Sequence, residues 1–308
     1  MQTLAAGMSY FDALFQGVPR IIAPALLHGP GGAAILDPGP SGTLATVRAE
    51  LESAGVRIAD LTAILLTHIH LDHAGATGTL VRENPRIRVF VHEKGAPHMA
   101  DPAKLLASAA RLYGDAMDRL WGAFEPVPRE AMVVLRGGER IEAGGRPLEV
   151  AYTPGHASHH VSYFNADTGM AFVGDTAGVR LRPDAFVMPA TPPPDVDLEL
   201  WSESFRIIDA WRPETLFLTH FGPSSPPRTH FTELREQLEI AARLVEQSLA
   251  RDETDEAREA WFADEVRRML ARMGASDAQA YEVAARFDLS WRGLARYFRT
   301  RKGVGQLR

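Results

Sequence analysis

The chain has 308 residues, of which 45% are hydrophobic, an ordinary proportion for a globular protein with a full core. It contains no cysteine, which excludes disulfide bonds, thiolate metal sites and a catalytic thiol, so any metal ligands must be histidine, aspartate or glutamate. The formal net charge of −6 gives no general attraction to nucleic acid, and we expect no nucleic-acid partner.

Nothing near the start of the sequence is typical of a targeting segment. Residues 1–6 lack a basic lead and a sustained apolar core, which is why we expect no signal peptide. No apolar run is long enough to span a bilayer. These features predict a soluble, cytoplasmic protein without a membrane partner.

The hydrophobic pattern predicts alternating strands and helices, followed by helices alone. Predicted strands span residues 21–27, 33–36, 63–66, 86–91, 132–135, 148–152, 161–164, 170–173 and 215–218. Predicted helices span residues 42–54, 77–83, 104–122, 231–250, 254–273, 277–287 and 289–300. We therefore expect an α/β catalytic domain over residues 1–250 and a helical C-terminal extension over residues 251–308.

Three histidines and one aspartate follow the predicted strand 63–66 within six positions, in the stretch Thr67-His68-Ile69-His70-Leu71-Asp72-His73. Imidazole and carboxylate are natural ligands of zinc, and of iron or manganese. His68 and His70 face the same way because alternate residues leaving a strand share a side. Asp72 and His73 lie past the bend and can serve a second ion. For any one of these residues taken singly, a surface or core position without metal is the alternative.

Three later strands end in similar residues: Thr153-Pro154-Gly155-His156, Gly174-Asp175 and Leu218-Thr219-His220. The sequence Leu65-Leu66-Thr67-His68 is echoed by Phe217-Leu218-Thr219-His220. This echo suits two sheets whose strand ends meet at one edge, although it is too short to establish a repeat.

Together these four motifs resemble those of the metallo-β-lactamase superfamily. The first matches the THxHxDH signature and the others follow in the order found in that family, from Ile35 to Gly222. The resemblance implies an αββα sandwich, in which two mixed sheets are flanked by helices.

The resemblance also implies a dinuclear metal centre, with two Zn²⁺ as the expected cofactors and iron or manganese as alternatives. One metal is expected on His68, His70 and His156 and the other on Asp72, His73 and His220, with Asp175 bridging. Such a centre activates water as hydroxide, and Asp72 and Asp175 are its expected catalytic residues. By the same resemblance Asp37 orients the centre from below, a simple turn aspartate being the alternative.

The implied function is hydrolysis of a small-molecule ester, thioester or lactone, as in the glyoxalase II and lactonase branches. A non-haem iron oxidoreductase of the persulfide dioxygenase type is the alternative. The flavodiiron branch is disfavoured because His70 stands where those proteins usually place glutamate. A binding protein without chemistry is disfavoured because all seven ligand positions are filled. The stretch after Asp175 lacks the tyrosine common in acyl-homoserine lactonases, and no glutathione pocket can be identified.

Other residues are candidates for the surroundings of the centre. His159 and His160 are expected to support the loop of His156. By the same resemblance, the predicted helix 104–122 is expected to be an insertion that covers the active-site mouth. The Pro-rich loop 182–197 can wall a pocket. Further candidates for the cleft, with core or surface positions as alternatives, are His92, His98, Tyr113, Met117, Trp121 and Phe124. The C-terminal helices could form a lid, a homodimer contact or a passive cap.

Overall fold

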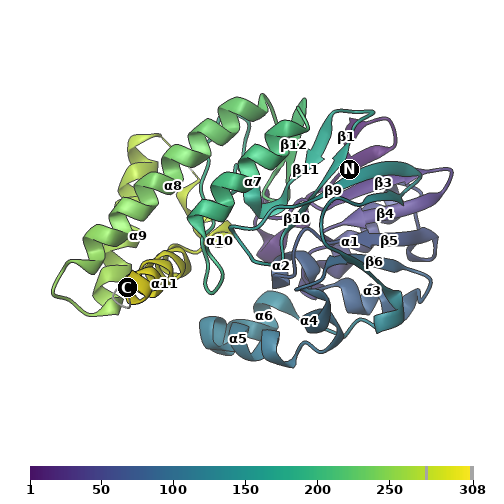
Figure 1. Ribbon diagram of the computed structural model, residues 1–308. Coiled ribbons are helices and arrows are strands. Elements are labelled where there is room, and N and C mark those ends of the chain that lie inside the picture. The colour runs from purple at the N-terminus through teal and green to yellow at the C-terminus, as the bar shows by residue number, and fades with distance from the viewer. Residues whose placement is uncertain (275–276, 306–308) are drawn as a thin grey trace.

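A computed structural model, which describes residues 1–274 and 277–305, contains two mixed β-sheets packed face to face and covered by helices (Figure 1). The first sheet has the order β1 (Gln2–Ala5), β2 (Met8–Tyr10), β3 (Ala25–Gly29), β4 (Gly32–Leu36), β5 (Leu61–Leu65), β6 (Arg88–His92) and β7 (Met132–Leu135). The second has the order β13 (Gly222–Ser224), β12 (Thr215–Leu218), β11 (Met170–Phe172), β10 (Val161–Asn165), β9 (Arg146–Tyr152) and β8 (Arg140–Ala143). This is the layered α/β sandwich that the sequence predicts.

The strand pattern explains the layers. In β4, Ala34 and Leu36 pack into the core between the two sheets, whereas Ile35 packs on the other face, because successive side chains of a strand point to opposite sides. Helices α1 (Leu44–Ser53) and α3 (Thr77–Glu83) cover that outer face. On the second sheet the outer face is covered by α7 (Leu198–Ala210) and α8 (Pro227–Leu249).

The remaining helices form two groups beside the sandwich. Figure 1 shows α4 (Ala96–Ala100), α5 (Ala103–Tyr113) and α6 (Met117–Trp121) at its lower edge, and α9 (Asp255–Arg272), α10 (Ala278–Ala284) and α11 (Phe287–Gly305) at the left. The C-terminal group shares a hydrophobic core with the segment 179–198, which lies between β11 and the start of α7 in the chain. Within the described ranges, no helix is long and apolar enough to cross a membrane.

Most predicted elements are confirmed within a few residues, but two differ. The strand predicted at 21–27 begins only at Ala25, because the backbone of Ile21 to Pro24 is turned toward the strand ends of the second sheet; Ala23 N–H donates to Thr219 O over 2.8 Å. The helix predicted at 104–122 breaks at Gly114, where φ is +52°. The strands and α-helices that the pattern did not predict are β1, β2, β8, β13, α2 (Leu71–Ala74), α4 and α7.

The topology places several strand ends at one edge of the sandwich. Strands β4 to β7 run parallel to one another, as do β11 and β12, so their carboxyl ends are on the same side of each sheet. The loop and short helix α2 (Leu71–Ala74) that follow β5 carry the first motif. The other three motifs follow β9, β11 and β12.

Helix α11 lies unusually close to the Pro-rich loop that runs past this edge. A Cβ atom built on Gly293 would lie 2.0 Å from the carbonyl oxygen of Thr191. Thr191 Oγ1 donates to Ser290 O over 3.0 Å in the same contact. Gly293 therefore permits the backbone of α11 to touch the loop.

We expect Gly293→Ala to destabilise the protein, although alanine in a helix interior normally stabilises by about 1 kcal/mol relative to glycine. The clash with Thr191 should outweigh that gain and lower the free energy of unfolding by about 1–3 kcal/mol. Urea unfolding followed by circular dichroism measures the change. Gly42→Ala, whose Cβ would meet only ordinary contacts at 3.6 Å, is the control. A stabilised Gly293→Ala variant would contradict the packing of α11.

Candidate metal centre

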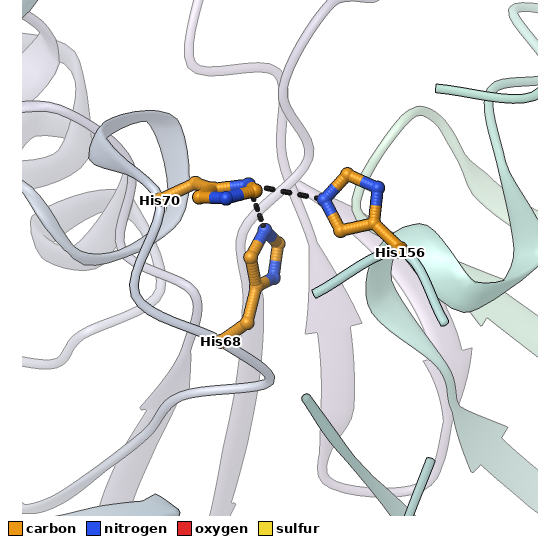
Figure 2. Close-up of side chains that lie close together, drawn as sticks. All are labelled: His68, His70 and His156. Atoms are coloured by element: carbon orange, nitrogen blue, oxygen red, sulfur yellow. Dashed lines mark hydrogen bonds between the residues drawn. The ribbon is translucent and has the colours of Figure 1, made fainter. Parts of the chain in front are cut away.

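Three histidine rings from two separate loops converge at the edge of the sandwich (Figure 2). His68 and His70 come from the loop after β5, and His156 comes from the loop after β9. His68 Nε2 lies 2.9 Å from His70 Nδ1, and His156 Nε2 lies 3.0 Å from the same atom of His70. Three ring nitrogens at such distances form one face of a candidate cation site.

A second group contains Asp72 and His73 of α2 and His220 after β12. His220 Nε2 lies 3.5 Å from Asp72 Oδ2, and His73 Nε2 lies 3.8 Å from the same oxygen. The two sheets thus each contribute to both groups, as expected from the chain order of the motifs.

Asp175 lies between the two groups, in a 3₁₀ helix (Gly174–Ala177) that follows β11. Its Oδ2 is 3.5 Å from His156 Nε2, whereas its Oδ1 is 3.2 Å from His73 Nε2 and 3.4 Å from His220 Nε2. One carboxylate oxygen therefore faces each group. This is the arrangement expected of a bridging ligand between two cations.

Unpaired atoms of the second group and of Asp175 fit a divalent cation. Among the described residues, His73 Nε2, His220 Nε2 and Asp175 Oδ1 are buried and make no hydrogen bond. Buried polar atoms without partners are rare and costly in folded proteins. A nitrogen–nitrogen–oxygen set of this kind suits zinc, iron or manganese, so the residues present fit the metals that the sequence suggested.

Backbone carbonyls fix the orientation of two rings. His156 Nδ1–H donates to Ala190 O over 2.8 Å, and His220 Nδ1–H donates to Ile21 O over 2.5 Å. With Nδ1 protonated, Nε2 of each ring keeps its lone pair directed at the centre. Sequence reasoning could not identify these two hydrogen-bond acceptors, because every residue has a backbone carbonyl.

Asp37 connects the two sheets beneath the centre. Its Oδ2 accepts hydrogen bonds from Thr67 Oγ1 and Thr219 Oγ1, each over 2.7 Å, and from His73 Nδ1–H over 2.9 Å. Its Oδ1 accepts from the backbone N–H of Thr67 over 2.8 Å. The alternative of a simple turn aspartate is therefore wrong, because this residue orients a ring of the centre. Its φ of +46° is a conformation that residues other than glycine rarely adopt.

Close packing also positions the loops of Asp175 and His156. A Cβ atom on Gly174 would lie 2.5 Å from Thr67 Oγ1, and one on Gly155 would lie 2.4 Å from Trp201 Cα. Trp201 of α7 donates from Nε1 to Thr176 O over 2.8 Å. The helix that the sequence pattern did not predict therefore supports two of the motif loops.

Burial sets the charge state of the first group. It lowers the pKa of His68 well below its usual value, lowers that of His70 to about 4 and also lowers that of His156, and neighbouring imidazoles act in the same direction. These rings are therefore neutral near pH 7, which is the form that binds a cation.

The second group has the opposite electrostatics. Burial alone would lower the pKa of His73, but Asp175, Asp72 and Asp37 raise it well above the usual value. Burial alone would raise the pKa of Asp72, but His73 and His220 lower it to about 2. Anionic carboxylates thus surround this end of the site, and they favour a positive charge there.

The two other histidines of the second motif take different positions. His160 is buried and its Nδ1 contacts the hydroxyls of Thr153 and Thr176 at 3.0 and 3.2 Å, as a support of the loop would. His159 Nδ1 accepts from Ile69 N–H over 3.4 Å, and its ring is stacked 6.0 Å from His68.

A cavity of about 590 Å³ opens above the centre, within the range of roughly 300–1,000 Å³ typical of ligand sites. His98, Tyr113, Trp121 and the prolines 192–194 line it, as the sequence suggested. The other cleft candidates are not among the lining residues: His92 stacks on Tyr152, and Met117 and Phe124 pack against the hydrophobic cluster that contains Trp121. Residues 282–286 of the C-terminal helical region also line the cavity. The sequence pattern did not distinguish such a position from that of a passive cap.

Comparisons with known proteins agree with this geometry. The solved structure of metallo-beta-lactamase family protein TTHA1429 from Thermus thermophilus has a TM-score of 0.74 and 22% identity, over 97% of this chain and 95% of that one. That of ST1585 from Sulfolobus tokodaii has a TM-score of 0.63 and 22% identity, over 94% and 98%. At these identities the likeness establishes the fold alone.

Curated relatives match over part of their length. Metallo-beta-lactamase fold-containing protein ST1585 of Sulfurisphaera tokodaii is 30% identical over 54% of this chain and 62% of its own. A hydroxyacylglutathione hydrolase of Synechococcus sp. is 32% identical over 49% and 47%. The chain thus spans about half the length of these relatives. The family model of the metallo-beta-lactamase superfamily matches residues 19–220, more than half of the chain, and the chain therefore belongs to that superfamily.

Proposed function

We propose that the protein is a metal-dependent hydrolase that cleaves an ester, thioester or lactone bond with two divalent cations, zinc being the favoured metal. The observation that carries this proposal is the Asp175 carboxylate, which directs one oxygen to each of two histidine-containing groups. Similarity to a hydroxyacylglutathione hydrolase, a hydrolase by its name, supports the reaction class.

The seven residues have distinct roles in this proposal. His68, His70 and His156 hold one cation as neutral imidazoles, while Asp72, His73 and His220 hold the other. When bound, the two cations polarise the substrate carbonyl and supply hydroxide from water near neutral pH. The hydrolysis adds water across the acyl bond and gives a carboxylic acid and an alcohol or thiol.

The chain's own groups prepare the site for this chemistry. His70 and Asp72 are partly exposed on the cavity wall, whereas His68 and His73 are fully buried beneath it. Substrate therefore approaches across His70 and Asp72. Against the effect of burial, His73 and His220 lower the pKa of Asp72 to about 2, so this carboxylate is anionic through the neutral range.

Replacement of His68 or Asp175 by alanine should abolish hydrolysis and leave a folded protein, because each change removes a ligand but no large part of the core. We expect kcat/KM for the best thioester or lactone substrate to fall by about a thousandfold or more. Dialysis of the wild-type protein against a chelator should have the same effect, reversed by adding zinc.

Circular dichroism and gel filtration verify the fold of both variants. Glu214→Ala, a change in the loop before β12 at a distance from the motif loops, is the matched control and should retain activity. Full activity in either ligand variant would contradict the assigned roles.

Asp37→Asn should weaken metal binding without removing a ligand. The neutral amide no longer matches the three donors that meet at Asp37 Oδ2, and the Nδ1–H of His73 loses its anionic acceptor. Changes of this kind typically reduce metal affinity by about 10- to 100-fold. Competition with a zinc-chelating dye measures the affinity, with Asp167→Asn on an exposed turn as control. Equal affinity in a folded Asp37→Asn protein would exclude an orienting role.

The reaction class is tested with metal analysis and a substrate panel. Two zinc ions per chain together with turnover of thioesters or lactones support a hydrolase. One iron per chain with oxygen uptake in the presence of a persulfide would instead identify an oxidoreductase and overturn the proposal.

A further inference from the structure

One wall of the cavity is apolar and is built from three distant parts of the chain. Ile22 comes from the segment before β3, Leu105 and Leu112 from α5, and Val283 from α10. Trp121 of α6 lies in the same hydrophobic cluster as Ile22, and Leu105 and Val283 pack against that cluster. Because this cavity also contains His70 and Asp175, the apolar wall adjoins the candidate metal centre.

Two charged residues of α10 and the residues just after it, Arg286 and Glu282, are paired with neighbours. Arg286 Nη2 donates to Asp288 Oδ2 over 2.6 Å, and its guanidinium lies 5.5 Å from the centre of the Tyr113 ring. Glu282 accepts from Arg267 Nη2 over 2.6 Å. Their heads are therefore engaged, and the wall offers mainly hydrocarbon surface to a ligand.

Polar residues of the lining come both from these helices and from other elements. Lys104 and Ser108 belong to α5 and Arg119 to α6, whereas Lys94 and His98 belong to the segment from β6 to α4 and Ser158 to the loop after β9. Lys94 Nζ donates to the hydroxyl of Tyr152 over 2.8 Å. The leaving oxygen or sulfur gains negative charge as the acyl bond breaks. A positively charged or hydrogen-bond-donating side chain such as Lys94 therefore favours the leaving group on its side of the cavity. The acyl part of the substrate would then contact the apolar wall.

We propose that this wall binds an apolar acyl chain, and that the substrate is an acyl ester, thioester or lactone with a chain of roughly six to twelve carbons, given the size of the cavity. The C-terminal helical region then takes part in substrate selection through Val283. This inference rests on the proposed hydrolase function and specifies its substrate class.

The test is a chain-length series on the zinc-loaded full chain, with N-acetylcysteamine thioesters from acetyl to dodecanoyl. Each methylene that reaches the wall should raise kcat/KM about three- to fourfold, because apolar surface is removed from water. The increase should stop once the chain fills the cavity. Acetate esters of long-chain alcohols are measured in parallel.

Two variants narrow the cavity at this wall, and one widens it. Leu112→Trp and Val283→Trp should each shift the preferred acyl chain to shorter lengths and reduce kcat/KM for the longest good substrate about tenfold or more, with little effect on the acetyl thioester. Leu112→Ala should shift the preference to longer chains. Ala110→Trp on α5 and Gln279→Trp on α10 place the same side chain at exposed positions outside the lining, and should change nothing.

Hydrolysis that is independent of acyl length would overturn the inference while leaving the proposed function intact. Equal effects of the wall variants and their exposed controls would also overturn it, as would a preference for long-chain alcohol acetates over long-chain acyl thioesters. Failure to hydrolyse any compound of either series would contradict the proposed function itself and remove the inference with it.

Discussion

The carboxylate of Asp175, shared between two groups of imidazoles, is the contact on which the site depends. Its oxygens lie 3.2 to 3.5 Å from ring nitrogens of His73, His220 and His156, and the residue is almost fully buried. Such a concentration of buried polar groups is costly unless positive charge compensates it. The surrounding carboxylates also raise the pKa of His73, because they favour a positive charge at that end of the site. Two divalent ions would satisfy both groups at once.

The fold brings these residues together by aligning strand ends rather than by local sequence. Asp37, at the end of β4, holds Thr67 beyond β5 of the first sheet and Thr219 beyond β12 of the second. The two sheets are thereby joined at the edge where the centre lies. Helix α7 adds a second brace through Trp201, which binds the segment of Asp175 by a hydrogen bond to Thr176 O.

Much of this arrangement could be predicted from the sequence. Short apolar runs followed within four residues by histidine or aspartate mark the ends of β5, β9, β11 and β12, and the structure brings all seven candidate ligands together. The chain pattern could not reveal supports made by backbone carbonyls, such as Ile21 O, because every residue carries one.

Other features were missed for different reasons. Helix α7 does have a start signal, since the side chain of Asp197 accepts from Leu200 N–H, but the sequence pattern places that aspartate at the end of the Pro-rich loop. The break at Gly114 depends on a φ of +52° that a helical pattern does not exclude. The place of residues 282–286 in the cavity depends on how α10 packs, which no local pattern records.

The stoichiometry of zinc binding by metal-stripped protein tests the dinuclear centre most directly. Titration monitored by a competing chromophoric chelator, with crystallography at the zinc edge to locate the ions, should give two zinc ions per chain, one near His68, His70 and His156 and the other near Asp72, His73 and His220, with Asp175 touching both. A folded chain that takes up no zinc, or a single ion that leaves one group without metal, would contradict the dinuclear centre.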